Sequence, residues 1–300
     1  MDFEPYRGEL AAYCYRMLGS YHDAEDLVQE TLLRAWKARE RYDPARASVR
    51  TWLYRIATNV CLTALEGRAR RALPSGLVAV GEDPRTPLVP APEVPWLEPF
   101  PGTEVRADLR LAWVAAVQLL PARQRAVLVL REVLAFSAAE VAEQLDTTVA
   151  AVNSALQRAR SAVAAADEGE VREPADPEVR AVVERYVRAF EAADVPGLVR
   201  LLAADAVLEM PPVPLWYRGT EHYEVFMADV FRRRGSGWVL RELVANGQPA
   251  LAAYAPDAGG GAPWLHSLQV LGVAGGRITS IVAFADPAGF TAFDLPPHLG

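Results

Sequence analysis

The chain has 300 residues, 51% of them hydrophobic, and a formal net charge of −7. This length predicts about two domains, and the apolar content is sufficient for packed cores. The negative balance excludes a chain that is basic throughout and argues against a free high-affinity DNA binder, so any contact with DNA is expected to depend on a larger partner.

Cys14 and Cys61 are the only cysteines. They show neither metal-ligand spacing nor a disulfide framework, which fits a reducing cytosol. We find no signal peptide and no apolar run long enough to span a bilayer. We therefore expect a soluble, cytoplasmic protein with no membrane contact, no metal site and no cofactor.

A first helix is predicted over residues 3–19, followed by a second amphipathic helix in YHDAEDLVQETLLRAW. Apolar and small residues recur at helical spacing and define its buried face. They are Ala24, Leu27, Val28, Thr31, Leu32, Ala35 and Trp36. Asp26, Gln29 and Glu30 lie on the other face, which is either a docking surface for a basic partner helix or a solvated face.

A third helix is predicted to begin near Ser48, with Trp52, Arg55 and Asn59 pointing outward. Three arginines, Arg68, Arg70 and Arg71, close this segment. An exposed aromatic ring beside arginines can stack on unpaired bases while the arginines hold the backbone. Trp52 is equally compatible with a core position that anchors the preceding loop.

Residues 74–105 are rich in proline and acidic, so this segment is predicted to be a linker that is extended or disordered. Its patch WLEPFP, Trp96 to Pro101, is too apolar for a pure spacer, and we expect the patch to dock on protein. Beyond the linker, Arg123 and Arg125 lie near a helix start. Both either hold DNA phosphates or are ordinary surface arginines.

Ala139 to Ala166 reads as two helices joined by a turn at Asp146 to Thr148. Ser137 with Glu140 predicts a capping box at the first helix. The second helix is expected to bury Val149, Val152, Leu156, Ala159 and Val163. Its other face has side chains that suit a DNA groove, namely Asn153, Ser154, Gln157, Arg158 and Arg160. The alternatives are a DNA-binding helix-turn-helix and an amphipathic hairpin inside a core.

Residues 167–176 are predicted to form a second linker. Two helices follow, then strands and a further helix at Thr220 to Arg234, with Gly275–Gly276 turning the last two strands into a hairpin. This order indicates an α+β domain.

The segments DAEDLVQETLLRAW, TWLYRIATNVCLTALEGRARR and LPARQRAVLVLREVLAFSAAEVAEQLDTTVAAVNSALQRAR resemble regions 2 and 4 of extracytoplasmic-function (ECF) sigma factors of the sigma-70 family. RAFEAADVPGLVRLLAADAVLEMPP and WYRGTEHYEVF resemble a SnoaL-like domain. The expected fold class is multidomain, with two all-α sigma modules and a C-terminal α+β cone. The expected ranges are 1–73 for region 2, 74–105 for the linker, 106–166 for region 4 and 177–297 for the SnoaL-like domain.

The resemblance implies three contacts. Asp26, Gln29 and Glu30 would dock on core RNA polymerase. Trp52, Arg55 and Asn59, with the loop from Tyr42 to Val49, would capture the melted minus-10 strand, and Arg68, Arg70 and Arg71 would hold phosphates. Asn153, Ser154, Gln157, Arg158 and Arg160 would read promoter DNA at the minus-35 element. These contacts divide duplex reading from single-strand capture.

The SnoaL-like fold implies a cone-shaped pocket for an unknown small ligand. We expect Trp216, Tyr217, His222, Gln248 and His266 near its mouth, together with Glu209, Met210, Asn246 and Phe284. Some relatives of this fold cyclise or isomerise polyketides with an acid and base pair. No motif in this sequence places a carboxylate beside His266, so we name no catalytic residue.

The sequence therefore predicts a sigma factor whose acidic extension regulates it by packing on the sigma modules, through intramolecular contact, or on the linker or the polymerase. The competing hypothesis is a cyclase- or isomerase-like enzyme that carries a DNA-binding module. A repressor that binds duplex alone is disfavoured by the low basicity and by the presence of two separate modules.

Overall fold

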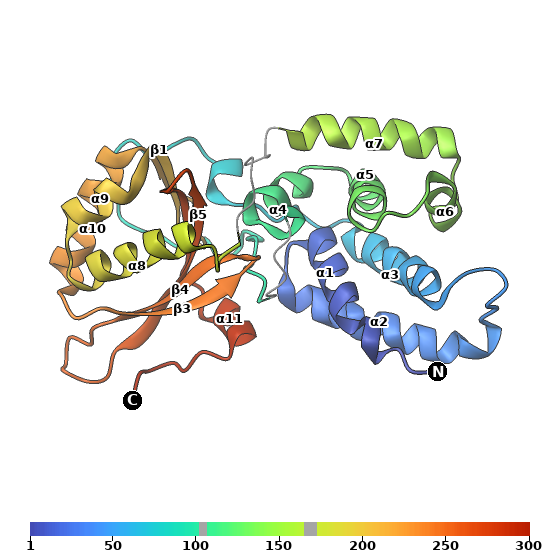
Figure 1. Cartoon of the computed structure of the whole chain (residues 1–300), viewed down its shortest axis with the longest axis horizontal. Helices are drawn as coiled ribbons and strands as arrows, with labels where there is room; N and C mark the ends of the chain where they lie inside the picture. Colours follow the sequence, from blue (N-terminus) through green and yellow to red (C-terminus); the bar gives the residue numbers. More distant parts are fainter. Residues whose placement is uncertain (102–106, 165–172) are drawn as a thin grey trace. The chain divides into compact units, whose positions relative to one another are not determined.

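The computed structural model describes residues 1–101, 107–164 and 173–300. Within these ranges the chain forms two compact units. The first contains Met1–Arg71 and the residues from Leu111 to the second gap, and the second contains Ala72–Arg110 and the residues after that gap. Figure 1 labels the α-helices and several strands of the two units, which are described in turn.

The first unit is entirely helical. Its elements are α1 (Arg7–Leu18), α2 (Tyr21–Ala38), α3 (Val49–Leu65), α4 (Leu111–Gln118), α5 (Ala122–Leu128), α6 (Ala138–Gln144) and α7 (Val149–Val163), with a π-helical turn, η5 (Val129–Val133), after α5 and short 3₁₀ turns η1 (Glu4–Tyr6) and η2 (Arg39–Arg41). In Figure 1, α1, α2 and α3 pack together, and α7 packs against α5.

Side-chain caps fix several helix starts in this unit. Ser48 accepts a hydrogen bond from the Thr51 amide at the start of α3, and Thr148 caps α7. The capping box predicted for Ser137 and Glu140 is confirmed, since each side chain bonds the other residue's amide. These caps satisfy amides that a helix start leaves without partners.

The second unit is α+β. Its elements are η3 (Pro74–Gly76), η4 (Ala107–Leu109), α8 (Pro177–Glu191), α9 (Val195–Leu201), β1 (Leu202–Glu209), β2 (Trp216–Arg218), α10 (Thr220–Arg234), β3 (Val239–Ala245), β4 (Gln248–Ala255), β5 (Trp264–Ala274), β6 (Arg277–Phe284), α11 (Pro287–Phe290) and η7 (Thr291–Phe293). The sheet order is β2-β1-β6-β5-β4-β3. The β1–β6 pair is parallel and the other pairs are antiparallel.

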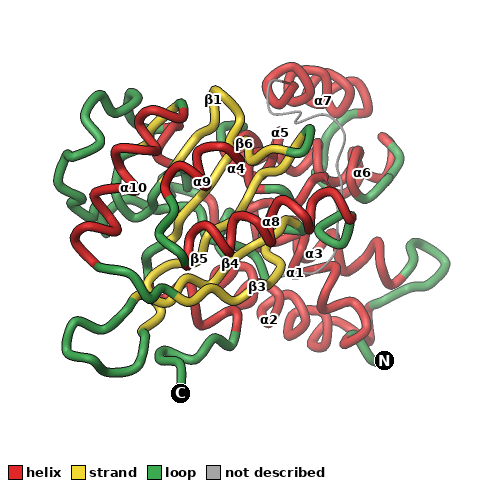
Figure 2. The backbone as a smooth tube through the Cα atoms, turned by 60° about the vertical axis from the view of Figure 1, so that its left-hand side comes forward, coloured by secondary structure: helices red, strands yellow, loops and turns green. Residues whose placement is uncertain are grey.

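Helices α8, α9 and α10 cover one face of this sheet, as Figure 2 shows. The inward residues of α8 include Val182, Tyr186 and Phe190, which are buried with Leu251 and Leu271 of the strands. Because three helices pack on one face of a curved sheet, the space between them becomes the core and, at one end, a cavity.

The fold class predicted from the sequence is confirmed in both parts. Two inward assignments are wrong. Trp36 is 55% exposed in the last turn of α2, where the Arg39 guanidinium lies 4.1 Å from its ring centroid. Val149 is 44% exposed in the first turn of α7, because the buried face of that helix begins one turn later at Val152. No helix of the described residues is long and apolar enough to cross a membrane.

Candidate functional sites

The outward face of α2 combines acidic and apolar side chains. Asp26 and Gln29 are exposed, and Glu30 accepts a hydrogen bond of 2.6 Å from the Arg34 guanidinium. Leu33 and Trp36 continue the same face and are 45% and 55% exposed. Large apolar side chains beside charges on one exposed stripe are typical of a protein-docking surface. Residues 26, 29, 30, 33 and 36 are called the α2 surface below.

A groove of about 550 Å³ lies between α3 and the loop before it. Trp52, Arg55 and Asn59 all line this groove, so the structure brings together the three outward residues of the third helix. The Trp52 ring packs 5.1 Å from Tyr42 and 5.9 Å from Phe3. Trp52 is half-buried and therefore both anchors the loop and contributes to the wall of this Trp52 groove.

Helix α6 closes the other side of the Trp52 groove. Glu140, Glu143 and Gln144 line it. The Arg55 guanidinium lies 3.7 Å from Glu143 and 3.7 Å from Asp146. Acidic side chains thus occupy the positions beside Arg55 where a nucleic-acid phosphate would bind.

Arg125 on α5 connects helices α4 to α7 to helices α1 to α3. It is 3% exposed, and it donates hydrogen bonds to the Met17 carbonyl, to the Gln118 side chain and, at 2.8 Å, to the Gln118 carbonyl. Burial, with a smaller contribution from the Arg70 charge, lowers the pKa of Arg125 to about 10. Neither sequence interpretation of Arg125 was right, since it is neither a surface residue nor open to phosphate, whereas Arg123 is exposed.

A second anchor lies beside this one. Phe136 is 5% exposed, and its ring lies 5.6 Å from that of Tyr54 on α3. The Arg50 guanidinium stacks over Phe136 at 5.3 Å and also bonds Glu9 at 2.9 Å. The first unit is therefore held by a buried polar contact and an aromatic contact besides the ion pairs at the groove.

The outward face of α7 is solvent-exposed along its length. Its exposed side chains are Asn153, Ser154, Gln157, Arg158 and Arg160. Arg160 forms an ion pair of 2.7 Å with Glu132. The other four offer amide, hydroxyl and guanidinium groups on one side of a capped helix, as major-groove reading requires.

The three arginines after α3 have different surroundings. Arg68 and Arg71 bond Asp23 at 3.2 and 2.9 Å, whereas Arg70 is exposed. If Arg68 or Arg71 binds a phosphate, that phosphate takes the place of the Asp23 carboxylate as the partner of the guanidinium.

In the second unit, Asn246 holds the linker. Asn246 is 0% exposed and has a φ of 55° in the turn between β3 and β4. Its side chain accepts a hydrogen bond of 2.9 Å from the Phe100 amide and donates one of 2.8 Å to the Leu109 carbonyl. Its own amide donates to the Phe100 carbonyl at 2.8 Å. Buried polar groups paired in this way fix one position of the chain.

The earlier part of the linker follows the β1–β2 edge. The Ser75 amide donates to Glu209 at 2.8 Å, and the Trp216 indole donates to the Val78 carbonyl at 3.0 Å. The Tyr217 hydroxyl donates to the Asp83 carbonyl at 3.0 Å. Burial raises the pKa of Glu209, while the Ser75 amide opposes that shift. The described part of the linker is therefore ordered by the second unit, so of the two expected alternatives, extended or disordered, the disordered one does not hold.

The apolar linker patch is buried in this unit. Trp96, Leu97 and Phe100 are 8%, 1% and 7% exposed. The Trp96 indole donates to the Ala91 carbonyl at 2.8 Å. The patch therefore docks on protein, and its partner is the C-terminal part of the same chain.

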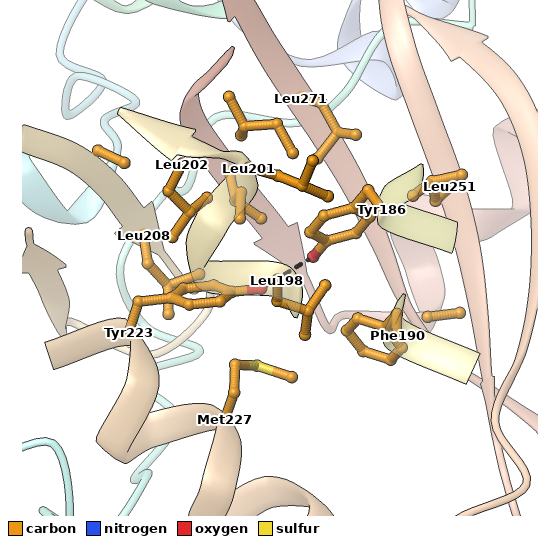
Figure 3. Packing of buried hydrophobic residues seen from close by; sticks show 14 of the residues in the cluster. Tyr186, Phe190, Leu198, Leu201, Leu202, Leu208, Tyr223, Met227, Leu251 and Leu271 are labelled. Atoms are coloured by element: carbon orange, nitrogen blue, oxygen red, sulfur yellow. Dashed lines mark hydrogen bonds between the residues drawn. The ribbon is translucent and has the colours of Figure 1, made fainter. Parts of the chain in front are cut away.

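A cavity of about 400 Å³ lies among the linker, α8, α10 and the sheet. At one end the Tyr186 hydroxyl lies 3.2 Å from that of Tyr223 and donates to Gln269 at 2.9 Å. Figure 3 shows the two tyrosines turned toward each other above Met227. Pro84, Thr86, Pro87 and Leu88 of the linker complete the wall.

His266 lines the same cavity from β5. Burial, with a smaller effect from the Arg234 charge, lowers the pKa of His266 to about 4, so its ring is neutral at pH 7. Aromatic rings flank it, with Trp238 at 5.3 Å and Trp264 at 5.2 Å between ring centroids. Asp229 also lines the cavity but is paired with Arg232 and Arg233.

Three segments of the chain match the models of known protein families. Residues 3–71 match the model for Sigma-70 region 2, residues 110–163 match Sigma-70, region 4, and residues 183–281 match the SnoaL-like domain. The chain is 49% identical over 313 aligned positions to the ECF RNA polymerase sigma factor SigG of Mycobacterium tuberculosis, covering 99% of this chain and 83% of that protein. The chain belongs to the ECF sigma factors.

Two further comparisons agree with this assignment. SigJ, another ECF sigma factor of M. tuberculosis, is 29% identical, with coverage of 98% of this chain and 94% of SigJ. The crystal structure of SigJ matches with a TM-score of 0.70 and 26% identity, covering 98% of this chain and 99% of SigJ. This ECF sigma factor therefore has sigma regions 2 and 4 followed by a SnoaL-like domain along one chain.

The structure places the five predicted pocket residues in different surroundings. Only His266 of the five lies in the cavity wall. Trp216 and Tyr217 bond the linker, as described above, because they lie on the edge strand β2. His222 stacks on Tyr217 and bonds the Arg218 carbonyl, and the Gln248 side chain donates to the Leu271 carbonyl.

Four other residues had been expected near the cavity mouth. Met210 lines the cavity, whereas Phe284 is buried but does not belong to the lining. Glu209 and Asn246 bond the linker instead. Sequence reasoning missed Trp238, which lines the cavity and follows a Gly-Ser-Gly turn that carries no sign of a pocket. Among the residues that the structure describes, no group of three or more acidic, histidine or cysteine side chains could hold a metal ion.

Proposed function

We propose that this ECF sigma factor uses three surfaces of its first unit in promoter-specific initiation. The α2 surface docks on core RNA polymerase, the Trp52 groove with Arg68, Arg70 and Arg71 captures the non-template minus-10 strand, and the outward face of α7 reads the minus-35 element. The observation that carries this proposal is the groove itself, where an aromatic ring, a guanidinium and an amide converge on one concave surface.

The same groove suggests that the free chain is held closed. Glu143 and Asp146 pair with Arg55, so a DNA phosphate has to displace two carboxylates. Because α6 belongs to the helix-turn-helix, DNA capture in the groove requires region 4 to move away from region 2. Docking on a polymerase with separate sites for the two regions would supply the free energy for this opening.

The C-terminal domain is proposed to regulate through the linker. The linker joins region 2 to region 4, and Asn246, Glu209 and Tyr217 bond it to the SnoaL-like domain. A linker bound along this domain has fewer accessible conformations, which restricts how far regions 2 and 4 can separate. Releasing it would favour the open sigma factor.

The enzymatic alternative has less support. Acid–base catalysis at His266 needs a carboxylate within hydrogen-bond reach. The His266 ring packs beside Trp238 and Trp264, and the Asp229 carboxylate in the same wall is committed to two arginines. We therefore propose a regulatory rather than a catalytic use of the cavity.

Run-off transcription with mycobacterial core polymerase on a genomic promoter library tests this function. The full chain is compared with a chain lacking residues 167–300 and with the double variant Asn153→Ala, Gln157→Ala. We expect specific transcripts from the full chain, altered yield after truncation, and loss of selection at minus-35 in the double variant without loss of core binding.

The single variant Arg158→Ala on the same helix face should likewise weaken selection at the minus-35 element, because it removes one of the proposed base-reading side chains. Failure of the full chain to bind core polymerase would overturn the assignment of the α2 surface. Unchanged transcription after truncation would remove the regulatory role.

A further inference from the structure

Two hydrogen-bonding nitrogens in the wall of the 400 Å³ cavity have no partner. The Trp238 indole nitrogen belongs to a side chain that is 3% exposed, and the His266 Nδ1 atom is buried; neither makes a hydrogen bond among the described residues. By contrast, Tyr186, Tyr223 and Gln269 in the same wall are paired with one another. Buried donors are nearly always paired in folded proteins, so these two nitrogens point to a missing acceptor.

Arg234 supplies a positive charge to the same end of the cavity. Its neighbours on α10, Arg232 and Arg233, both pair with Asp229, whereas no carboxylate of the described residues lies within ion-pair distance of Arg234. The Arg234 guanidinium stacks 5.4 Å from the centroid of Trp264, which in turn packs on His266. Burial lowers the pKa of Arg234, as expected for a cation that lacks a counter-ion.

The rest of the wall is mainly apolar. Its apolar side chains include Phe190, Leu208, Met210, Val213, Phe226 and Ile281. A volume of about 400 Å³ falls in the range of small-molecule sites, which combine apolar walls with a few placed polar groups.

We propose that this cavity binds a small apolar carboxylic acid, whose carboxylate is held by Trp238, His266 and Arg234 and whose apolar body fills the remainder. The carboxylate accepts from the indole N–H and from the imidazole in the tautomer protonated at Nδ1, and it pairs with the guanidinium. A charge-assisted hydrogen bond of this kind is stronger than one between neutral groups.

The acid would also contact the sigma linker. Pro84, Thr86, Pro87 and Leu88 form one side of the cavity, next to the Asp83 carbonyl that Tyr217 holds. The acid therefore binds more tightly to the protein with its linker docked than to the protein with its linker released. By thermodynamic reciprocity, the bound acid favours the docked linker to the same extent. This coupling rests on the regulatory role proposed above, whereas binding of the acid does not.

Calorimetric titration of the full chain tests the binding half. The probes are 2-naphthoate and decanoate, which differ in shape, and each is compared with its neutral amide. We expect at least one acid to bind at least tenfold more tightly than its amide. Equal affinity for acid and amide, or no binding of either acid at millimolar concentration, would overturn the carboxylate assignment.

Variants of the wall sharpen this test. Trp238→Phe keeps an aromatic ring but removes the donor, and Arg234→Met removes the charge. Each is expected to weaken binding of the acid about tenfold, the effect of losing one charge-assisted contact. Arg232→Met is the matched control, because it changes an arginine on the same helix outside the cavity wall and should leave affinity within twofold. Unchanged affinity in Arg234→Met would contradict the proposal.

Amide hydrogen exchange tests the coupling half without polymerase. Saturating acid should slow exchange of the amides in residues 83–91 several-fold and leave α2 unchanged. Binding without any change in these amides would overturn the coupling and leave the acid site intact. Because neither measurement involves transcription, failure of the sigma assignment and failure of this proposal can be told apart.

Discussion

Two contacts in this protein, one between regions 2 and 4 and one between the linker and the SnoaL-like domain, depend on different kinds of interaction. At the Trp52 groove, Arg55 meets Glu143 and Asp146 at 3.7 Å, and these side chains are 41%, 69% and 85% exposed. In the second unit, Asn246 is fully buried, and its side chain makes one hydrogen bond to Phe100 of the linker and one to Leu109. Exposed ion pairs are weak and screened by salt, whereas buried polar contacts are costly to break.

The contacts that cover the proposed DNA site therefore differ from the contacts that hold regions 2 and 4 together. The groove ion pairs cover Arg55 but contribute little free energy. The free energy that keeps region 4 on region 2 resides in buried contacts such as that of Arg125. The free energy that keeps the linker on the SnoaL-like domain resides in buried contacts such as that of Asn246 with Phe100. Five variants or conditions test this division, from the largest expected effect to the smallest.

Arg125→Met should have the largest effect. It leaves the Met17 carbonyl and the Gln118 side chain buried without their donor, which costs roughly 3 kcal/mol of unfolding free energy. Urea unfolding monitored by circular dichroism measures the change. Arg123→Met is the control, because Arg123 is exposed, and a similar loss in both variants would contradict the anchoring role of Arg125.

Asn246→Gly should release the linker. Glycine tolerates the φ of 55° at this position, so the variant removes the side-chain bonds to Phe100 and Leu109 without adding backbone strain. The expected cost is about 2 kcal/mol, seen as faster hydrogen exchange at the Phe100 amide. Asn246→Asp keeps the acceptor for Phe100 but not the donor for Leu109, so its exchange rate at the Phe100 amide should lie between those of the parent and Asn246→Gly. Equal exchange rates in all three proteins would show that the Asn246 side chain does not hold the linker.

The pH dependence of stability isolates His266. Its pKa is about 4 in the folded protein, below the usual value of 6.5, so the unfolded chain binds the proton more readily. Stability contributed by the neutral ring is complete above pH 6.5 and is lost as the pH falls toward 4, at up to about 1.4 kcal/mol per pH unit. His266→Gln should flatten this part of the curve in chemical denaturation, and a slope that matches the parent would show that the ring titrates normally.

Gly81→Val should displace the linker beside the cavity. A Cβ at Gly81 would lie 2.6 Å from the Tyr217 ring and 2.9 Å from the Leu215 side chain, and Tyr217 is fully packed. We expect a loss of about 1–2 kcal/mol in docking, measured by protease cleavage of residues 77–91. Gly76→Ala is the matched control in the same linker, where a Cβ would lie at an ordinary 3.8 Å from Ala72. Equal cleavage of the two variants would place the linker away from β2.

Glu143→Gln should change stability least, by less than about 1 kcal/mol, because its pair with Arg55 is exposed. Its effect should instead appear in DNA affinity, since one carboxylate no longer competes for Arg55. Fluorescence anisotropy with a single-stranded minus-10 oligonucleotide at low salt measures this gain, and it should shrink at 0.5 M salt. A variant that loses affinity would indicate that Glu143 does not compete with DNA.

Local rules predicted much of this fold. Helical period and caps located the helices of the first unit, including the starts at Ser48 and Ser137, because these signals lie within one turn of the residues they organise. The hairpin at Gly275 and the helix from Thr220 to Arg234 were predicted for the same reason. The resemblance to ECF sigma factors then supplied the family, which the comparisons confirm.

The missed features depend on contacts between distant segments. Arg125 bonds Met17 across 108 residues, and Asn246 bonds Phe100 across 146. The Asn246-Gly247 dipeptide indicates a turn but not what its side chain will bond. Trp238 became a cavity residue because the sheet brings β3 and β5 onto one core with α8, and no local pattern records that arrangement. Long-range packing, rather than propensity, decides such positions.

Permanganate reactivity of promoter thymines tests the central claim, that the Trp52 groove captures the minus-10 strand. Mycobacterial core polymerase is incubated with a supercoiled promoter and either the parent sigma factor or Trp52→Ala, with core binding measured in parallel. We predict reactive thymines in the minus-10 element with the parent and at least a tenfold weaker signal with Trp52→Ala at equal core binding. Equal reactivity from the two proteins would show that another surface melts the promoter.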